Sequence, residues 1–156
     1  MLGMRRREAV DLDPSPVWPW FDDGDQPRVL IEHPDPAGQH LLAEAFRRRG
    51  YDTLTCGGPA AQGESSVSCP LLVHGSCPAV DGADVVVSSL QVNQGTEGQV
   101  VRRMVEDPNA PPLLLEATTW QMSQVELSGS VEARCYPFTS PSKVVDRAEE
   151  LMIVGS

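Results

Sequence analysis

Three cysteines and one histidine stand close together in the sequence, and their side chains are of the kinds that bind metals or respond to oxidants. Cys56, Cys69, His74 and Cys77 occur in one Gly-, Ser- and Pro-rich stretch. Their spacing matches no standard zinc pattern, which usually contains a pair of ligands separated by about two to four residues. A chain that returned over the end of the strand before Cys56 would still bring the three thiols together. We therefore keep a redox or metal site at these four residues as one hypothesis.

Two further interpretations of the same stretch stay open. A disulfide between Cys69 and Cys77 would act as a transient redox switch in a reducing compartment. The pairs Cys69-Pro70 and Cys77-Pro78 look like the short haem-regulatory motif, in which a thiolate binds iron. The alternative to all of these is that the cysteines are small buried apolar residues with no cofactor.

A second group of reactive side chains is His33 with the serines Ser88 and Ser89. A histidine near carboxylates can transfer protons, and a serine could act as the nucleophile. However, no Gly-x-Ser-x-Gly elbow surrounds either serine, and no phosphate-binding Gly-x-x-x-x-Gly-Lys pattern occurs after Gln91. We therefore predict that the protein is not an enzyme.

Alternating strand and helix patterns must position these residues. Short apolar runs predict buried strands at 28–31, 51–55, 83–88, 113–115 and 131–135. Asp35 with Pro36 predicts the start of a helix that Gly50 ends. Thr96 and Gln99 form a capping-box pattern for a second helix, and Ser140-Pro141 predicts the start of a last one. Residues 59–82 indicate an irregular loop, and 118–127 a short helix.

This order of elements predicts an α/β fold with a doubly wound, five-stranded parallel sheet. Parallel strands need crossover connections, so helices are expected on both faces, with a flavodoxin-like strand order of 2-1-3-4-5. In such folds the functional cleft lies beyond the carboxyl ends of the strands. His33, Cys56, Ser88 and Ser89 all follow or end predicted strands at that edge.

The first 27 residues differ from the rest of the chain. Closely spaced prolines exclude a regular helix or a central strand there, so we predict a flexible arm at 1–27 and one domain at 28–156. Trp18, Trp20 and Phe21 lie among acidic residues of this arm. They are candidates for docking a partner, and the alternative is that their rings fold back on the domain.

Charge and hydropathy restrict the partners. The formal net charge is -10, which repels nucleic-acid backbones, so no direct contact with DNA or RNA is expected. No apolar run approaches the roughly 18 residues that a membrane helix needs, and no signal-peptide core follows the first arginines. These features predict a cytoplasmic protein without membrane attachment.

Residues 28–152 resemble the receiver domain of two-component response regulators, which is CheY-like. The resemblance rests on the element order, on Arg28-Val29-Leu30-Ile31 with Asp35-Pro36, on Gly50-Tyr51, and on Tyr136-Pro137-Phe138. Such domains accept a phosphoryl group on an aspartate at the end of the third strand.

The resemblance implies that this chemistry is degenerate here. The magnesium-binding acidic pair falls on Pro34 and Asp35, and the phosphoacceptor aspartate falls on Ser88 or, as we expect, Ser89. The hydroxyl residue that ends the fourth strand falls on Glu116, and the lysine falls on Tyr136. The resemblance thus implies an atypical pseudo-receiver that regulates without phosphorylation, by binding a small ligand or another protein. We predict that it needs no cofactor and that it binds a partner protein, or a second copy of the chain, in transcriptional or developmental control.

Overall fold

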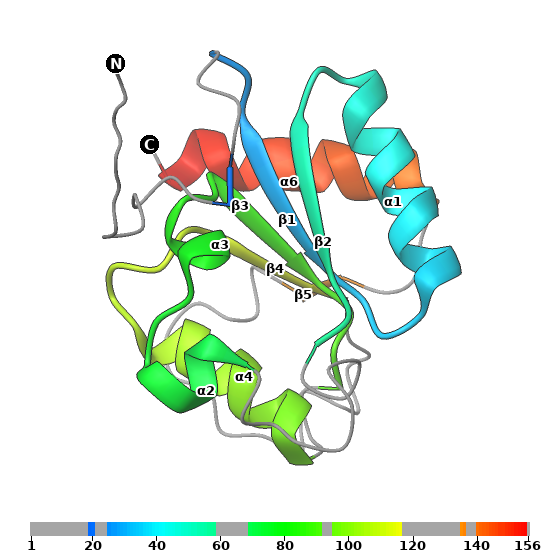
Figure 1. The fold of residues 1–156 in the computed structure, drawn as a ribbon. Coiled ribbons are helices and arrows are strands. Elements are labelled where there is room, and N and C mark those ends of the chain that lie inside the picture. The colour runs from blue at the N-terminus through cyan, green and yellow to red at the C-terminus, as the bar shows by residue number, and fades with distance from the viewer. Residues whose placement is uncertain are drawn as a thin grey trace, which may run out of the picture.

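The structure is a computed structural model that describes residues 19–20, 25–58, 69–91, 95–116, 135–136 and 140–155. These residues form a parallel sheet with helices packed on both of its faces (Figure 1). The strand order is β2-β1-β3-β4-β5, and every described pair is parallel. Four strands have four or five residues, whereas β5 has only two.

The elements follow one another as strand and helix through most of the chain. The strands are β1 (Arg28–Glu32), β2 (Asp52–Cys56), β3 (Val85–Ser88), β4 (Leu113–Glu116) and β5 (Cys135–Tyr136). The helices are α1 (Pro36–Arg48), α2 (Pro70–His74), α3 (Pro78–Asp81), α4 (Gly95–Glu106) and α6 (Pro141–Gly155).

Two apolar layers hold the helices to the sheet. Alternate residues of a strand face opposite sides, so Val29 and Ile31 of β1 pack with α1 and α6, while Leu30 packs with α2, α3 and α4. The middle strand β3 follows the same rule and is buried along its whole length. Because both faces are covered, these strands are continuous apolar runs instead of alternating apolar and polar residues.

The predicted α/β fold with a parallel sheet is therefore confirmed, and the four longer strands have the predicted order. The first helix begins as predicted, because Asp35 accepts a hydrogen bond of 3.2 Å from the backbone N–H of Ala37 and Pro36 is the first helical residue. Part of the predicted irregular loop at 59–82 is helical, as α2 and α3, and 59–68 lie outside the described residues. The predicted helix at 118–127 and residues 131–134 of the fifth strand also lie outside them.

The capping-box prediction at Thr96 is wrong. Helix α4 already includes Gly95, so Thr96 lies inside the first turn instead of before it. The carboxylate of Glu97 instead accepts a hydrogen bond of 2.9 Å from the backbone N–H of Gln91 and so fastens the preceding loop to the helix. An acidic residue in the first turn also suits the helix dipole.

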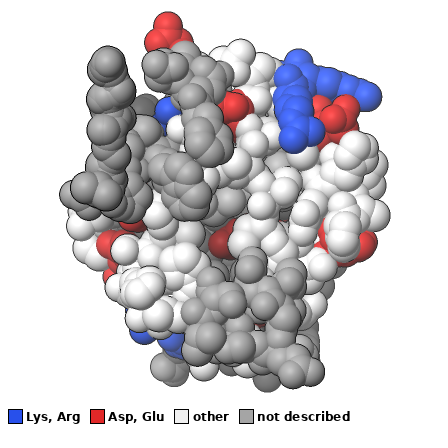
Figure 2. Space-filling view, viewed as in Figure 1, with Lys and Arg blue, Asp and Glu red and all other residues white. Residues whose placement is uncertain are grey.

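Basic side chains on the face drawn in Figure 2 gather near the end of α1, beside acidic ones. Arg47 there forms a 3.3 Å ion pair with Glu44 of the same helix. Across to α6, Arg49 pairs with Asp146 at 2.7 Å and Glu149 at 3.1 Å. Among the described residues, none of the helices is both long and apolar enough to cross a bilayer.

Candidate functional site

The carboxyl ends of the strands lie side by side at one edge of the sheet. The parallel register places Glu32 at the end of β1 between Cys56 of β2 and Ser88 of β3. At the other side of the sheet Glu116 of β4 pairs with Tyr136 of β5. This is the edge at which doubly wound folds bind their ligands.

Ser89, at the predicted phosphoacceptor position, follows directly after β3. Its backbone N–H donates a 2.7 Å hydrogen bond to the carbonyl of Glu32, and its hydroxyl donates a 2.8 Å hydrogen bond to Oε1 of Glu116. Two residues that the sequence assigned to the degenerate site are thus in direct contact. The hydroxyl of Ser89 serves as a donor to a carboxylate at this edge.

The remaining degenerate positions lie at the same edge but do not join this contact. Pro34 and Asp35 are exposed in the loop between β1 and α1, where Asp35 caps the helix. The backbone of Tyr136 ends β5 beside Glu116, and its side chain lies outside the described part of the structure.

His33 is directed toward α1. Its Nδ1 accepts a 3.0 Å hydrogen bond from the backbone N–H of Asp35, and its ring fills the space next to Gly38, where a Cβ would clash with Nε2. Within the described part of the chain, no hydrogen bond joins His33 to Ser88 or Ser89. The serine and histidine pair considered from the sequence is therefore not assembled.

Glu32 is a site residue that the sequence analysis did not single out. Its side chain is only 4% exposed, and its Oε1 has no hydrogen-bond partner among the described residues. Burial raises the pKa of this carboxyl to about 7, and a hydrogen bond with the Ser88 side chain opposes the rise. The only sequence signal was a charged residue at the end of an apolar strand.

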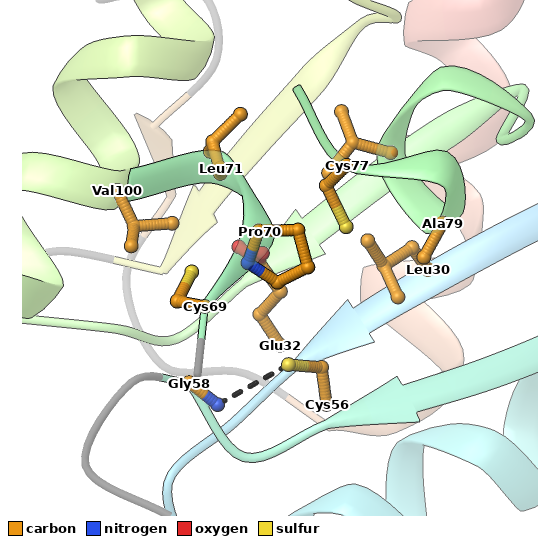
Figure 3. A pocket seen from close by; sticks show the side chains of 11 residues that line it. Leu30, Glu32, Cys56, Gly58, Cys69, Pro70, Leu71, Cys77, Ala79 and Val100 are labelled. Atoms are coloured by element: carbon orange, nitrogen blue, oxygen red, sulfur yellow. Dashed lines mark hydrogen bonds between the residues drawn. The ribbon is translucent and has the colours of Figure 1, made fainter. Parts of the chain in front are cut away.

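The three loop cysteines surround the same glutamate. Cys56, Cys69, Cys77 and Glu32 line one cavity of about 50 Å³, whose other walls are aliphatic residues of β1, α2, α3 and α4 (Figure 3). All three cysteines are free thiols of intermediate exposure. The structure thus brings together the three cysteines that were candidates for a redox or metal site.

Two of the thiols, those of Cys56 and Cys77, are held in their neutral form. Burial raises the pKa of Cys56 to about 11, a hydrogen bond from the Gly58 backbone N–H opposes this, and the nearby Glu32, Cys77 and Cys69 raise it further. The pKa of Cys77 is also raised, again first by burial. Burial of either thiol disfavours its charged form, because a thiolate is less well solvated there than in water.

His74 does not belong to this cluster. It is exposed at the end of α2 and does not line the cavity. The two Cys-Pro pairs have a local structural cause as well, because Cys69 and Cys77 precede α2 and α3, and the prolines occupy the first helical positions. Proline is favoured there because its missing N–H would have no partner inside the helix.

Of the aromatic residues in the N-terminal segment, the structure describes Trp20. It is 3% exposed, packs in the apolar layer with α2, α3 and α4, and donates a 3.1 Å hydrogen bond from Nε1 to the carbonyl of Ala79. Arg28 lies over its ring, 5.7 Å from the centroid. Trp20 therefore follows the alternative in which the ring folds back on the domain, and it is not exposed for docking. Trp18 and Phe21 lie outside the described residues.

Comparisons by sequence find no relative, since no family model and no curated protein matches the chain. Solved structures do match. A response regulator receiver domain protein from Bacillus halodurans is 15% identical with a TM-score of 0.50, over 81% of this chain and 94% of that one.

Two more solved structures have a similar fold. The chemotaxis response regulator CheY4 of Vibrio cholerae is 12% identical with a TM-score of 0.52, over 81% of this chain and 98% of that one. A response regulator from Thermotoga maritima is 15% identical with a TM-score of 0.50, over 82% and 98%. Identities this low indicate a shared fold and carry no information on activity. The chain therefore has the fold of a response-regulator receiver domain.

Proposed function

We propose that this protein is a phosphorylation-independent regulatory receiver that acts by binding a partner protein, in transcriptional or developmental control. The observation that carries this proposal is the contact at the end of β3 and β4, where the Ser89 hydroxyl is hydrogen-bonded to Glu116. A receiver fold implies a signalling role, and this contact occupies the place where the phosphoryl group would be attached.

The chemistry at this contact opposes phosphoryl transfer in two ways. A serine hydroxyl is not ionised near neutral pH, so it is a weaker nucleophile than a carboxylate. Glu116 adds negative charge where the three phosphoryl oxygens would need hydrogen-bond donors or cations. Pro34 has no side-chain oxygen with which to bind the magnesium ion that this reaction requires.

A groove on the face opposite the cysteine cavity supports the proposal of a partner. A groove of about 470 Å³ lies between α1 and α6, and its wall includes Leu41, a leucine with 59% of its surface exposed. An exposed leucine at the wall of a groove between two helices is suited to contact with a protein partner or with a second copy of the chain.

The absence of phosphorylation can be tested with small phosphodonors. The full chain is incubated with acetyl phosphate and Mg²⁺, and its intact mass is recorded before and after. We expect an unchanged mass. The matched control carries Pro34→Asp, Ser89→Asp, Glu116→Thr and Tyr136→Lys, which restore the acceptor and its neighbours. A stable phosphoryl adduct on the unmodified chain would contradict the proposal.

Partner binding can be tested with a photocrosslinking amino acid at Leu41 in cells that express the protein. The same label at the exposed Asp107, in the loop after α4, is the control. We expect a discrete adduct from Leu41, of a partner or of a second copy. Equal labelling from both positions would show that this groove is not the docking surface.

A second candidate function, a cysteine-based sensor, is favoured by one observation, which is that Cys56, Cys69 and Cys77 line a single cavity. The volume of about 50 Å³ excludes haem in this cavity, since pockets for organic ligands of that size occupy roughly 300 to 1,000 Å³. The two forms of the sensor that remain are a metal site and an oxidant-sensitive thiol site.

A further inference from the structure

Glu32 presents an unusual situation at the carboxyl end of β1. A carboxylate is rarely buried without a cation or a full set of hydrogen bonds, because removing it from water is costly. Here the side chain is 4% exposed, one of its oxygens has no partner in the described structure, and it lines the cavity with three thiols. The cavity therefore contains four groups that can each carry a negative charge, with aliphatic walls around them.

These four groups affect one another. Glu32, Cys56, Cys69 and Cys77 line one small cavity, so negative charges on any two of them would repel each other in surroundings of low polarity. A positive ion placed among them would remove this mutual repulsion and replace the lost hydration. An oxidant would instead need a reactive thiolate, which burial and repulsion both disfavour. The environment thus favours a cation over thiol oxidation.

The size of the cavity points the same way. A volume of about 50 Å³ has room for a few water molecules, since one water needs roughly 10 to 15 Å³. A single ion fits, and an organic ligand does not. Among common protein-bound metals, zinc-type divalent ions prefer thiolate sulfur and also accept a carboxylate oxygen in a four-ligand shell.

We propose that this cavity binds one thiophilic divalent metal ion of the zinc type, with the Sγ atoms of Cys56, Cys69 and Cys77 and the carboxylate of Glu32 as ligands. The proposal deepens the second candidate function and rests on it. It also replaces His74, the fourth ligand considered from the sequence, with a residue that lines the cavity. Each thiol that coordinates the ion releases its proton to solvent, so binding is coupled to proton release.

The ligands must move inward for this to happen. In the described residues, no three such side chains are arranged to hold an ion as they stand. Two of the thiols precede the short helices α2 and α3, of five and four residues, which pack in the apolar layer with α4. Rotation of the cysteine side chains and a small shift of α2 toward β1 would close the site.

The test uses the full chain, purified reduced and without oxygen, with Co²⁺ as a spectroscopic probe and Zn²⁺ as the competitor. We expect sulfur-to-cobalt charge-transfer bands that saturate at one Co²⁺ per chain and disappear when Zn²⁺ is added. Proton release, measured by calorimetry in buffers of different ionisation enthalpy, should accompany binding. A folded, fully reduced protein without these bands would overturn the proposal.

Variants assign the ligands. Cys56→Ser, Cys69→Ser and Cys77→Ser should each weaken cobalt binding by at least about 100-fold, and Glu32→Gln by about 10- to 100-fold. His74→Ala is the matched control and should bind as the unmodified chain does. Circular dichroism of every variant separates loss of the site from loss of the fold. Loss of binding in His74→Ala, or its retention in all three serine variants, would contradict the ligand set.

Oxidation gives the other clear outcome. If the reduced protein binds no metal and exposure to air instead forms a disulfide among these three cysteines, the site is an oxidant sensor and the metal proposal is wrong. Neither result affects the partner-binding proposal, because the phosphodonor and photocrosslinking experiments test that function on the opposite face and at the other strand ends.

Discussion

The hydroxyl of Ser89 donates a 2.8 Å hydrogen bond to Oε1 of Glu116, joining the ends of β3 and β4. The two residues lie at the positions where an active receiver carries its phosphoacceptor and the hydroxyl residue of the fourth strand, if the resemblance is followed position by position. In this chain the two positions contact each other directly. If that correspondence holds, Ser89 and Glu116 replace two family residues and are joined to each other by a hydrogen bond.

Replacing Ser89 with alanine should lower the free energy of unfolding by about 1 kcal/mol, because Glu116 would lose its donor in a partly buried place. Glu116→Gln alone should have a smaller effect, since an amide oxygen can still accept the hydrogen bond. Urea unfolding of Ser89→Ala, of Glu116→Ala, which removes the acceptor, and of the double variant measures the coupling between the two side chains. Additive effects would mean that the hydrogen bond contributes nothing to stability.

Trp20 should behave as a core residue. Trp20→Ala should lower the free energy of unfolding by about 3 to 5 kcal/mol, because it leaves a cavity against α3. Trp20→Phe should cost less, since it retains a ring but loses the hydrogen bond to Ala79.

A pair of truncations provides the control for Trp20. Removal of residues 1–18 keeps the tryptophan, and removal of residues 1–24 deletes it. Thermal unfolding should distinguish the two truncated chains, with the shorter one clearly less stable. Equal stability would show that Trp20 is a free docking residue after all.

The stability of the protein should fall with pH around neutrality, and Glu32 should be the cause. Its pKa is raised from 4.5 to about 7 in the folded protein, so the folded state holds more protons than the unfolded state between these values. By linkage, the free energy of unfolding then decreases as the pH rises through this window. The full effect above about pH 7 is on the order of 3 kcal/mol.

Glu32→Gln tests this assignment because it keeps the shape of the side chain and cannot ionise. The variant should be more stable than the unmodified chain at about pH 8 and nearly equal to it below the unfolded pKa of 4.5. Both the variant and the unmodified chain must be free of metal, since a bound cation would remove the free-energy cost of burying the ionised Glu32 carboxyl. A constant difference at every pH would point to lost contacts instead of the buried charge.

Cys56 should react slowly with alkylating reagents. A pKa of about 11 instead of 9.0 leaves about 100-fold less thiolate at neutral pH. Rates of iodoacetamide labelling, assigned by peptide mass mapping, should therefore be far below that of an unstructured cysteine peptide. After unfolding in urea the rate should rise to that of the peptide. Fast labelling of Cys56 in the folded protein would contradict the neutral, buried thiol.

Local and periodic features of the sequence determined much of the fold. The apolar runs at β1, β3 and β4 predicted buried parallel strands because only such strands are apolar on both faces. Asp35 with Pro36 predicted the start of α1 because capping depends on neighbouring residues alone. The positions of Ser89 and Glu116 at strand ends followed from the same element order.

The tertiary structure decided what depends on contacts between distant segments. Cys69 and Cys77 meet Cys56 because α2 and α3 cross over the edge of the sheet, and no periodic pattern in residues 59–82 predicts that path. Glu32 is buried because those helices cover it. Its residue type alone predicts an exposed side chain, since glutamate is almost never fully buried. Trp20 is a core residue because the space beside Ala79 accepts its ring. Burial and convergence are properties of the packed molecule, so the elements followed from the sequence and the cysteine cavity only from the fold.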